Sequence, residues 1–125
     1  MNHTPLVSIL IANYNNSRFI EETLDSAINQ TYKDIEIIIV DDFSIDNSIE
    51  VIERYIHNHP EKLIKLFKNE TNLGCGGSKR KCIEYSKGEL FAFLDPEDTI
   101  ELKSVEILVN KHIEYQEHSI IYSNL

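Results

Sequence analysis

The sequence has little positive charge. Its 125 residues include 12 Lys and Arg against 21 Asp and Glu, a net charge of −9 with histidine neutral. An acidic excess of this size repels phosphate backbones, so we expect no nucleic acid among its partners. An anionic ligand would therefore require a local cation or a bound metal ion.

Cysteine is scarce as well. Cys75 and Cys82 are the two cysteines, and their spacing of seven residues matches no common zinc or redox motif. We expect two reduced thiols in a cytosolic protein. A chain of this length buries about two-thirds of its unfolded surface, so it needs neither a disulfide nor a structural metal.

Long apolar runs are also missing. No run approaches the ~20 residues needed to span a bilayer. The first five residues, MNHTP, lack the basic start and apolar core of a signal peptide. We expect no transmembrane segment in this chain and a cytoplasmic location, either free or at the inner face of the cell membrane.

Short apolar runs alternate with amphipathic stretches along the whole chain. The runs predict strands over 6–11, 35–40, 63–67, 89–94 and 120–122. Helical periodicity predicts helices from 16 or 17 to about 28, from 47 to before Pro60, over 78–86 and over 99–115. This alternation predicts an α/β fold, a mostly parallel sheet with helices on both faces.

Local signals mark the expected ends of these helices. Side-chain caps at helix starts are predicted at Asn16 or Ser17, at Ser44 or Asp46, and at Asp98 with Glu101. A left-handed C-terminal cap is predicted at Gly88. In open sheets of this class, ligands bind along the carboxyl ends of the strands. The segments that follow the predicted strands are therefore the candidate site, namely 12–15, 41–44, 69–77 and 95–98.

The segment Asp95-Pro96-Glu97-Asp98 is the sharpest of these signals. If it stays extended, as Pro96 favours, the carboxylates of Asp95 and Glu97 lie on one face. Such a pair suits a hard divalent cation, magnesium or manganese. The alternatives are a capping role for Asp98 and a solvated turn for the other two acids.

Two further segments leave alternatives open. The pair Asp41-Asp42 suits a hydrogen bond from a ribose or base, a cation, or a turn into the next helix. Residues 72–81 place glycines and three basic residues at a helix start, which suits either a phosphate or a solvated basic surface. This segment has neither the P-loop nor the dinucleotide spacing.

Taken in order, four stretches resemble the N-terminal half of the inverting family-2 nucleotide-sugar glycosyltransferases, which have the GT-A fold. They are PLVSILIANYNN, TLDSAINQTYKDIEIIIVDDFSIDNS, NLGCGGSKRKCI and KGELFAFLDPEDTI. The resemblance extends from Pro5 to about Asn124. It implies that Ala12, Tyr14 and Asn15 line a nucleoside pocket. Asp42 would accept a hydrogen bond from the base, usually uracil, and Lys79 would reach the base or the diphosphate.

The same resemblance makes Asp95 to Glu97 an Asp-x-Asp motif that holds Mn²⁺ or Mg²⁺ on the diphosphate, with Asp95 also beside the nucleotide. Two departures are Glu97, which stands in place of the second aspartate, and Ala12, where proline or threonine is common. The longer Glu97 side chain must retract to reach the same ion.

The implied function is transfer of a sugar, most often from a UDP-sugar, to a saccharide or lipid-linked acceptor, as in polysaccharide biosynthesis. In the family the acceptor site and general base follow the point where this chain stops. We therefore expect residues 1–125 to form a single truncated domain, the donor-binding half, with no catalytic residue and no activity alone.

Two other functions compete with transfer. One is a non-catalytic nucleotide-binding fragment. The other is a receiver-type phosphoacceptor domain with Asp42 or Asp95 as its target, which the order of the motifs disfavours. In receiver domains the acidic pair follows the first strand, whereas here it follows the second.

Overall fold

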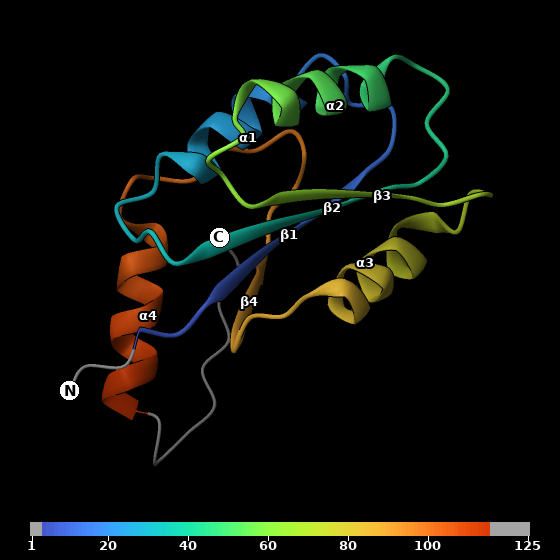
Figure 1. Cartoon of the computed structure of the whole chain (residues 1–125). Coiled ribbons are helices and arrows are strands. Elements are labelled where there is room, and N and C mark those ends of the chain that lie inside the picture. The colour runs from blue at the N-terminus through green and yellow to red at the C-terminus, as the bar shows by residue number, and fades with distance from the viewer. Residues whose placement is uncertain (1–3, 116–125) are drawn as a thin grey trace.

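Strands and helices alternate along residues 4–115, the part of the chain that this computed structural model describes (Figure 1). The elements are β1 (Val7–Asn13), α1 (Ile20–Ile28), β2 (Ile35–Asp41), α2 (Ser48–Asn58), β3 (Ile64–Lys68), α3 (Gly74–Tyr85), β4 (Leu90–Phe93) and α4 (Ser104–Tyr115). The strand expected at 120–122 lies outside the described residues. No helix within 4–115 is long and apolar enough to cross a membrane.

The strands form one parallel sheet in the order β3-β2-β1-β4. In its centre β1 and β2 run in register from the pair Val7 and Ile35 to the pair Asn13 and Asp41. Both strands are apolar almost throughout because each is covered on two faces. The predicted α/β class with a parallel sheet is confirmed.

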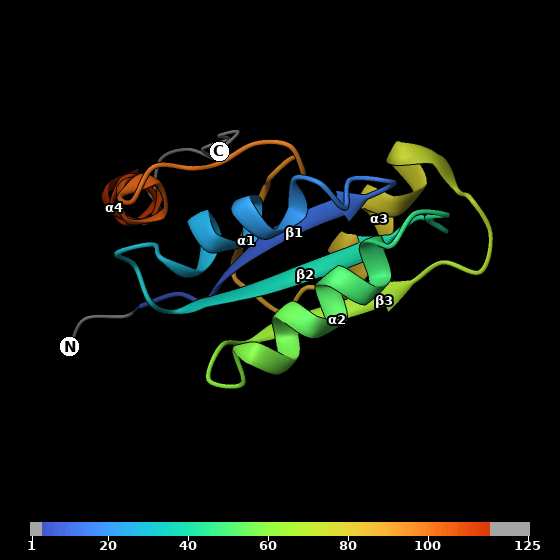
Figure 2. The same ribbon diagram turned by 90° about the horizontal axis from the view of Figure 1, so that it is seen from above.

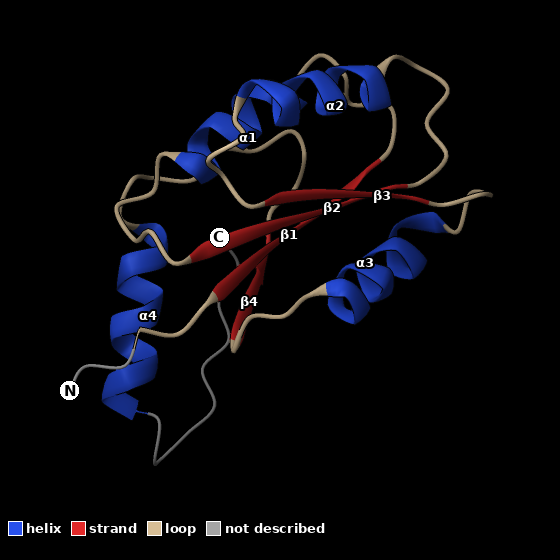
Figure 3. Ribbon diagram, viewed as in Figure 1, coloured by secondary structure: helices blue, strands red, loops and turns tan. Residues whose placement is uncertain are grey.

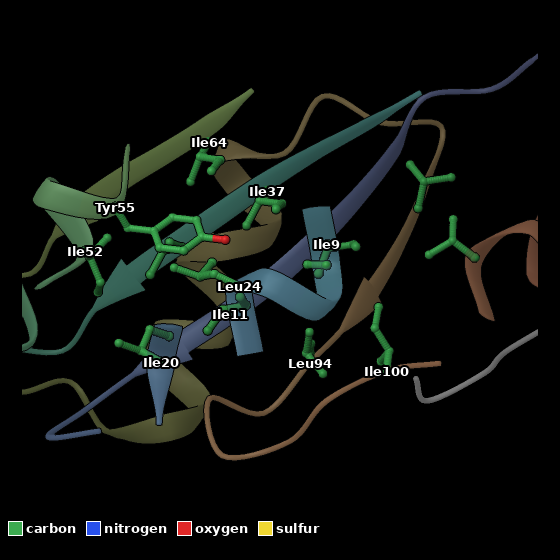
Figure 4. Close-up of a cluster of buried hydrophobic side chains, with 14 of the residues drawn as sticks. Ile9, Ile11, Ile20, Leu24, Ile37, Ile52, Tyr55, Ile64, Leu94 and Ile100 are labelled. Atoms are coloured by element: carbon green, nitrogen blue, oxygen red, sulfur yellow. The ribbon is translucent and has the colours of Figure 1, made fainter. Parts of the chain in front are cut away.

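Helices cover both faces of the sheet, as predicted. Figures 1 to 3 show α1 and α2 on one face and α3 on the other. Alternate residues of each strand point to opposite faces, so the core has two parts. The larger part, with α1 and α2, is drawn in Figure 4 and includes Ile9, Ile11, Leu24, Ile37 and Ile52. The smaller part, under α3, contains Leu10, Ile38, Val40 and Cys82.

The starts of α1 and α2 correspond only in part to the predicted caps. Neither Asn16 nor Ser17 caps α1 through its side chain; instead the main-chain oxygen of Asn16 accepts from the N–H of Ile20 at 3.0 Å. At α2 the N-cap residue is Asn47, which makes no side-chain cap bond, but Asp46, one residue earlier, accepts at its Oδ1 from the N–H of Ser48 at 2.9 Å.

The last helix starts later than predicted. α4 begins at Ser104 and not at 99, so the capping box of Asp98 and Glu101 is wrong. The main-chain oxygens of these two residues accept from Thr23 Oγ1 and Gln30 Nε2, each at 2.6 Å. These bonds hold residues 98–103 across α1 in an irregular path, and α4 then lies beside the ends where the strands begin (Figure 1).

Gly88 does not form the predicted left-handed cap. Gly74 is the only glycine with positive φ among the described residues, and α3 ends with Ser86 in an extended conformation. Gly88 is needed for another reason, which is close contact with β1. A Cβ atom there would lie 2.5 Å from Ser8 Oγ and 2.8 Å from the main-chain oxygen of Leu6.

The substitution Gly88→Ala is therefore expected to lower the free energy of unfolding by about 2 kcal/mol, because backbone atoms of β1 must move to admit the methyl group. Gly76→Ala is the matched control, since a Cβ atom there meets nothing within 4 Å and the position is helical. Urea denaturation of the three proteins measures both effects. Equal stability of Gly88→Ala and the parent would contradict the close contact.

Candidate functional site

A cavity of about 500 Å³ lies where the carboxyl ends of β1, β2 and β4 meet the start of α3. Its floor comes from Leu10 and Ala12 of β1 and Phe93 of β4. Polar and charged side chains surround this apolar floor, and they are Asn13, Tyr14, Asn16, Asp42, Asn72, Ser78, Lys79, Asp95, Glu97 and Asp98. The cavity thus has an apolar base and a polar rim, as small-molecule sites do.

All but one of the residues predicted for the site line this cavity. The lining residues are Ala12, Tyr14, Asp42, Lys79, Asp95 and Glu97. Asn15 lies beside the cavity in a left-handed conformation, with φ of 53°. Its Oδ1 accepts from the main-chain N–H of Ile45 and of Asp46, so it joins the loop after β1 to the loop after β2.

The two acids that follow β2 have different surroundings. Asp41 is fully buried and accepts from Asn13 Nδ2 at 2.9 Å and from Ser44 Oγ at 2.7 Å. The Asn13 bond joins the ends of β1 and β2 and the Ser44 bond belongs to the turn after β2, whereas the neighbouring Asp42 lines the cavity. Asp41 is therefore the turn residue of the pair, and Asp42 is the candidate ligand-binding residue.

Asp42 is 4% exposed, and its carboxylate holds the start of α3. It accepts from the N–H groups of Leu73 and Gly74 at 2.6 and 2.9 Å and from Asn69 Nδ2 at 3.0 Å. Burial raises the pKa of Asp42, but these hydrogen bonds together lower the pKa more, so it lies below its ordinary value. The carboxylate is consequently ionised at neutral pH and acts only as an acceptor.

α3 was predicted to begin at residue 78, and this contact explains why it begins at Gly74 instead. The carboxylate satisfies two N–H groups that a helix start leaves without partners, so the glycine-rich segment forms the first helical turn. It also places a negative charge where a phosphate would bind at a helix start. The N–H groups of Leu73 and Gly74 are therefore not open to a phosphate.

Lys79 supplies a positive charge to the cavity. Its Nζ lies 5.3 Å from the centre of the Phe93 ring, within the range of a cation–π interaction. Within residues 4–115 the lysine forms no ion pair with a carboxylate. In a chain of net charge −9, a cation with no carboxylate partner remains available to an anionic ligand.

The acidic loop after β4 is a turn and not an extended segment, which corrects the prediction that placed Asp95 and Glu97 on one face of a strand. The N–H of Asp98 donates to the main-chain oxygen of Asp95 at 3.0 Å, with Pro96 inside the turn, where proline is favoured. Thr23 Oγ1 anchors the loop by donating to the main-chain oxygens of Pro96 and Asp98.

The carboxylates of Asp95 and Glu97 are exposed and have no hydrogen-bond or ion-pair partner in the described part of the chain. Within 4–115, no group of three His, Cys, Asp or Glu side chains is arranged to hold a metal. The two carboxylates suit a Mg²⁺ or Mn²⁺ ion that takes two oxygen ligands from the protein and its remaining oxygen ligands from phosphate and water.

The cavity also involves residues that the sequence did not single out. Ser78 is fully buried and lines the cavity, and its Oγ accepts from Asn69 Nδ2 at 3.0 Å. Asn72 lines it from the loop before α3. The available signal was position, because Asn72 lies in the segment 69–77 that follows a predicted strand and Ser78 in the basic segment 72–81.

Sequence comparison identifies the family of the chain. The profile described as Glycosyl transferase family 2 matches residues 8–124. A cholesterol galactosyltransferase of Borreliella burgdorferi is 34% identical over 109 residues, which are 87% of this chain and 30% of that protein. A hyaluronan synthase of Pasteurella multocida is 32% identical over 98% of this chain and 12% of its own length. The chain thus spans less than a third of these relatives.

Solved structures agree with the fold. Staphylococcus aureus TarS (residues 1–349, in complex with UDP-GlcNAc) matches 88% of this chain and 32% of its own, with a TM-score of 0.81 and 26% identity. A mannosyltransferase from Pyrobaculum calidifontis, in complex with GDP-Man and Mn²⁺, matches 78% of this chain and 29% of its own, with a TM-score of 0.74 and 24% identity. Both neighbours have the GT-A fold. The chain belongs to glycosyl transferase family 2.

Proposed function

We propose that this chain binds the nucleoside diphosphate sugar, most often a UDP-sugar, of an inverting glycosyltransferase. One observation supports this most strongly: a cavity with an apolar floor brings the buried carboxylate of Asp42 to one edge of the sheet together with Lys79, Asp95 and Glu97, whose charges have no ion-pair partner within residues 4–115. The relatives are transferases, and the TarS neighbour is in complex with UDP-GlcNAc.

In this proposal, different cavity residues bind the nucleoside and the diphosphate of the donor. Tyr14 and Ala12 border the nucleoside, with the half-exposed Tyr14 ring available for stacking on the base. Asp42, an acceptor only, takes a hydrogen bond from a base N–H. Asn15 supports this end of the cavity by holding the loops after β1 and β2 together.

The diphosphate lies toward Lys79 and the acidic loop in this proposal. Asp95 and Glu97 hold Mn²⁺ or Mg²⁺, as the manganese complex of the archaeal neighbour suggests. When bound, the ion supplies positive charge to the departing diphosphate. Lys79 adds a second positive charge without needing the metal.

The acceptor, a saccharide or a lipid-linked sugar, would bind outside the described residues. Because the chain spans 30% or less of the two relatives named above, residues 1–125 are proposed to be a single truncated domain, the donor-binding half.

A non-catalytic nucleotide-binding fragment remains the second candidate, favoured by the same donor cavity. The receiver-type alternative is wrong, since the chain belongs to a glycosyltransferase family.

The test is calorimetric titration of the chain with UDP in the presence of Mn²⁺. Asp42→Ala is expected to weaken binding at least tenfold, because it removes the acceptor for the base and releases the start of α3. Asp34→Ala, an exposed acid that precedes β2 at the opposite edge, is the charge-matched control and should bind as the parent does. Equal binding by Asp42→Ala would remove Asp42 from the site.

A further inference from the structure

Asn69 is the residue that follows β3, and the proposed function gives it no role. Its main-chain N–H donates to the oxygen of Asp41 at 2.9 Å, which continues the pairing of β3 with β2 by one residue. The residue is half-buried and is not part of the cavity lining. A ligand in the cavity would therefore not touch it.

The Asn69 side chain joins three elements beneath the cavity. Its Nδ2 donates to Asp42 Oδ1 and to Ser78 Oγ, each at 3.0 Å. One residue thereby connects the end of β2, the end of β3 and the second turn of α3. The orientation of the amide follows from chemistry, since an ionised carboxylate only accepts and the NH₂ group must face it.

Both partners of Asn69 are cavity residues. Asp42 is 4% exposed and Ser78 is fully buried, and each lines the cavity. Lys79, the next residue of α3 after Ser78, carries the positive charge of the cavity. The position of Asn69 therefore affects the acceptor at one end of the cavity and the helix that bears the cation at the other.

The Asp42 carboxylate also binds two main-chain donors at the start of α3. Oδ1 accepts from the N–H of Leu73, and Oδ2 accepts from the N–H of Gly74. Asn69, by contrast, donates to this carboxylate from the end of β3. It ties Asp42 to a strand, whose place in the sheet does not depend on where α3 lies.

We propose that Asn69 is a positioning residue of the donor site, which acts through Asp42 and Ser78 and touches no ligand. It holds the carboxylate and the second turn of α3 in the arrangement that the nucleotide requires. The inference rests on the proposed function and extends it to a residue outside the cavity.

The test is a double-mutant cycle on UDP binding with Mn²⁺, measured by calorimetry. The four proteins are the parent, Asn69→Ala, Asp42→Ala and the double variant. Asn69→Ala alone should weaken binding about tenfold, as expected for loss of a hydrogen bond to a charged group. Added to Asp42→Ala, it should change binding by less than about twofold, because the charged partner of Asn69 is already gone and only its bond to the neutral Ser78 hydroxyl remains to be lost. Equal tenfold losses in both backgrounds would overturn the proposal.

Two further variants separate positioning from general damage to the fold. Asn69→Asp has the same shape but places an oxygen against the Asp42 carboxylate, so it should bind UDP more weakly than Asn69→Ala. Asn110→Asp on α4 adds the same charge at an exposed position and should bind as the parent does. Binding by Asn69→Asp that equals or exceeds that of Asn69→Ala would overturn the proposal.

A readout without nucleotide distinguishes failure of this inference from failure of the proposed function. Hydrogen exchange of the Leu73 and Gly74 amides should be at least fivefold faster in Asn69→Ala, while amides of β1 stay unchanged. Unchanged exchange at Leu73 and Gly74 would overturn the inference even if UDP binds. If the parent chain fails to bind UDP, the proposed function fails, and the exchange rates alone decide the role of Asn69. Should Asn69→Ala unfold, Asn69→Ser, which keeps a hydroxyl donor, is measured in its place.

Discussion

The 125-residue chain alone is expected to transfer no sugar, even when it binds the donor well. Inverting transfer requires a base against the acceptor hydroxyl, on the face opposite the leaving diphosphate. Four carboxylates line the cavity, at Asp42, Asp95, Glu97 and Asp98, and three of them are assigned to the donor. Base assistance alone contributes roughly 10²- to 10⁴-fold, and loss of acceptor positioning adds to that.

The two acids of α4 lie at the wrong end of the sheet to replace the base. Glu106 and Glu114 belong to α4, which follows a segment bonded to the end of α1. The main chain of Leu102 accepts from the N–H of Thr31, just before β2 begins. α4 therefore lies beside the starting ends of the strands, whereas the cavity lies at their carboxyl ends (Figure 1).

The measurement compares the 125-residue chain with a family member of full length in assays with UDP-sugars and a panel of saccharide and lipid-linked acceptors. Hydrolysis of the donor in the absence of acceptor is the blank. Robust transfer by the 125-residue chain would refute the half-enzyme interpretation. The search for a base would then turn to Asp98, the unassigned carboxylate of the cavity, and Asp98→Asn would be the first variant to assay.

Removal of the divalent cation is expected to weaken UDP binding on the order of 100-fold. A diphosphate that binds beside the exposed carboxylates of Asp95 and Glu97, in a chain of net charge −9, meets repulsion, and the cation converts these carboxylates into ligands. About 3 kcal/mol of charge compensation corresponds to roughly 100-fold in affinity. Calorimetry with UDP in Mn²⁺ and in excess chelator measures the difference.

Charge-matched variants test which carboxylates are responsible for the dependence of UDP binding on Mn²⁺. In Asp95→Asn with Glu97→Gln, the dependence on Mn²⁺ should disappear, and binding should equal that of the parent in chelator or be slightly tighter. In Glu101→Gln with Glu114→Gln, two exposed acids outside the cavity are neutralised, and the dependence on Mn²⁺ should persist. Equal affinity of the parent with and without chelator would show that Asp95 and Glu97 hold no metal.

Most of the fold could be predicted from the sequence because its signals are local. The apolar runs of β1 and β2 are continuous, since both strands are covered on two faces, and they predicted a parallel sheet correctly. Parallel strands share one carboxyl edge, so strand direction alone was enough to bring together the residues that follow each strand. Family membership was predicted from the same stretches and is confirmed.

Contacts between distant segments account for the two helix starts that were predicted wrongly. α3 begins four residues early because Asp42, at the end of β2, supplies the partners for Leu73 and Gly74. α4 begins late because Thr23 and Gln30 of the α1 region take the carbonyls that a helix would have used.

The amino-acid sequence by itself determined the order of the elements, the parallel sheet and the edge where Asp42 and Asp95 meet, because periodicity and strand direction suffice for these. The family resemblance added Lys79 to that edge. Only the tertiary structure decided that Asp41 belongs to a turn while Asp42 lines the cavity, and that Asn69 joins Asp42 to Ser78. The physical reason is that the bonds of Asp41 to Asn13 and of Asp42 to Asn69 and Leu73 join residues 27 or more positions apart. They depend on how the strands and α3 come together, and no local pattern records them.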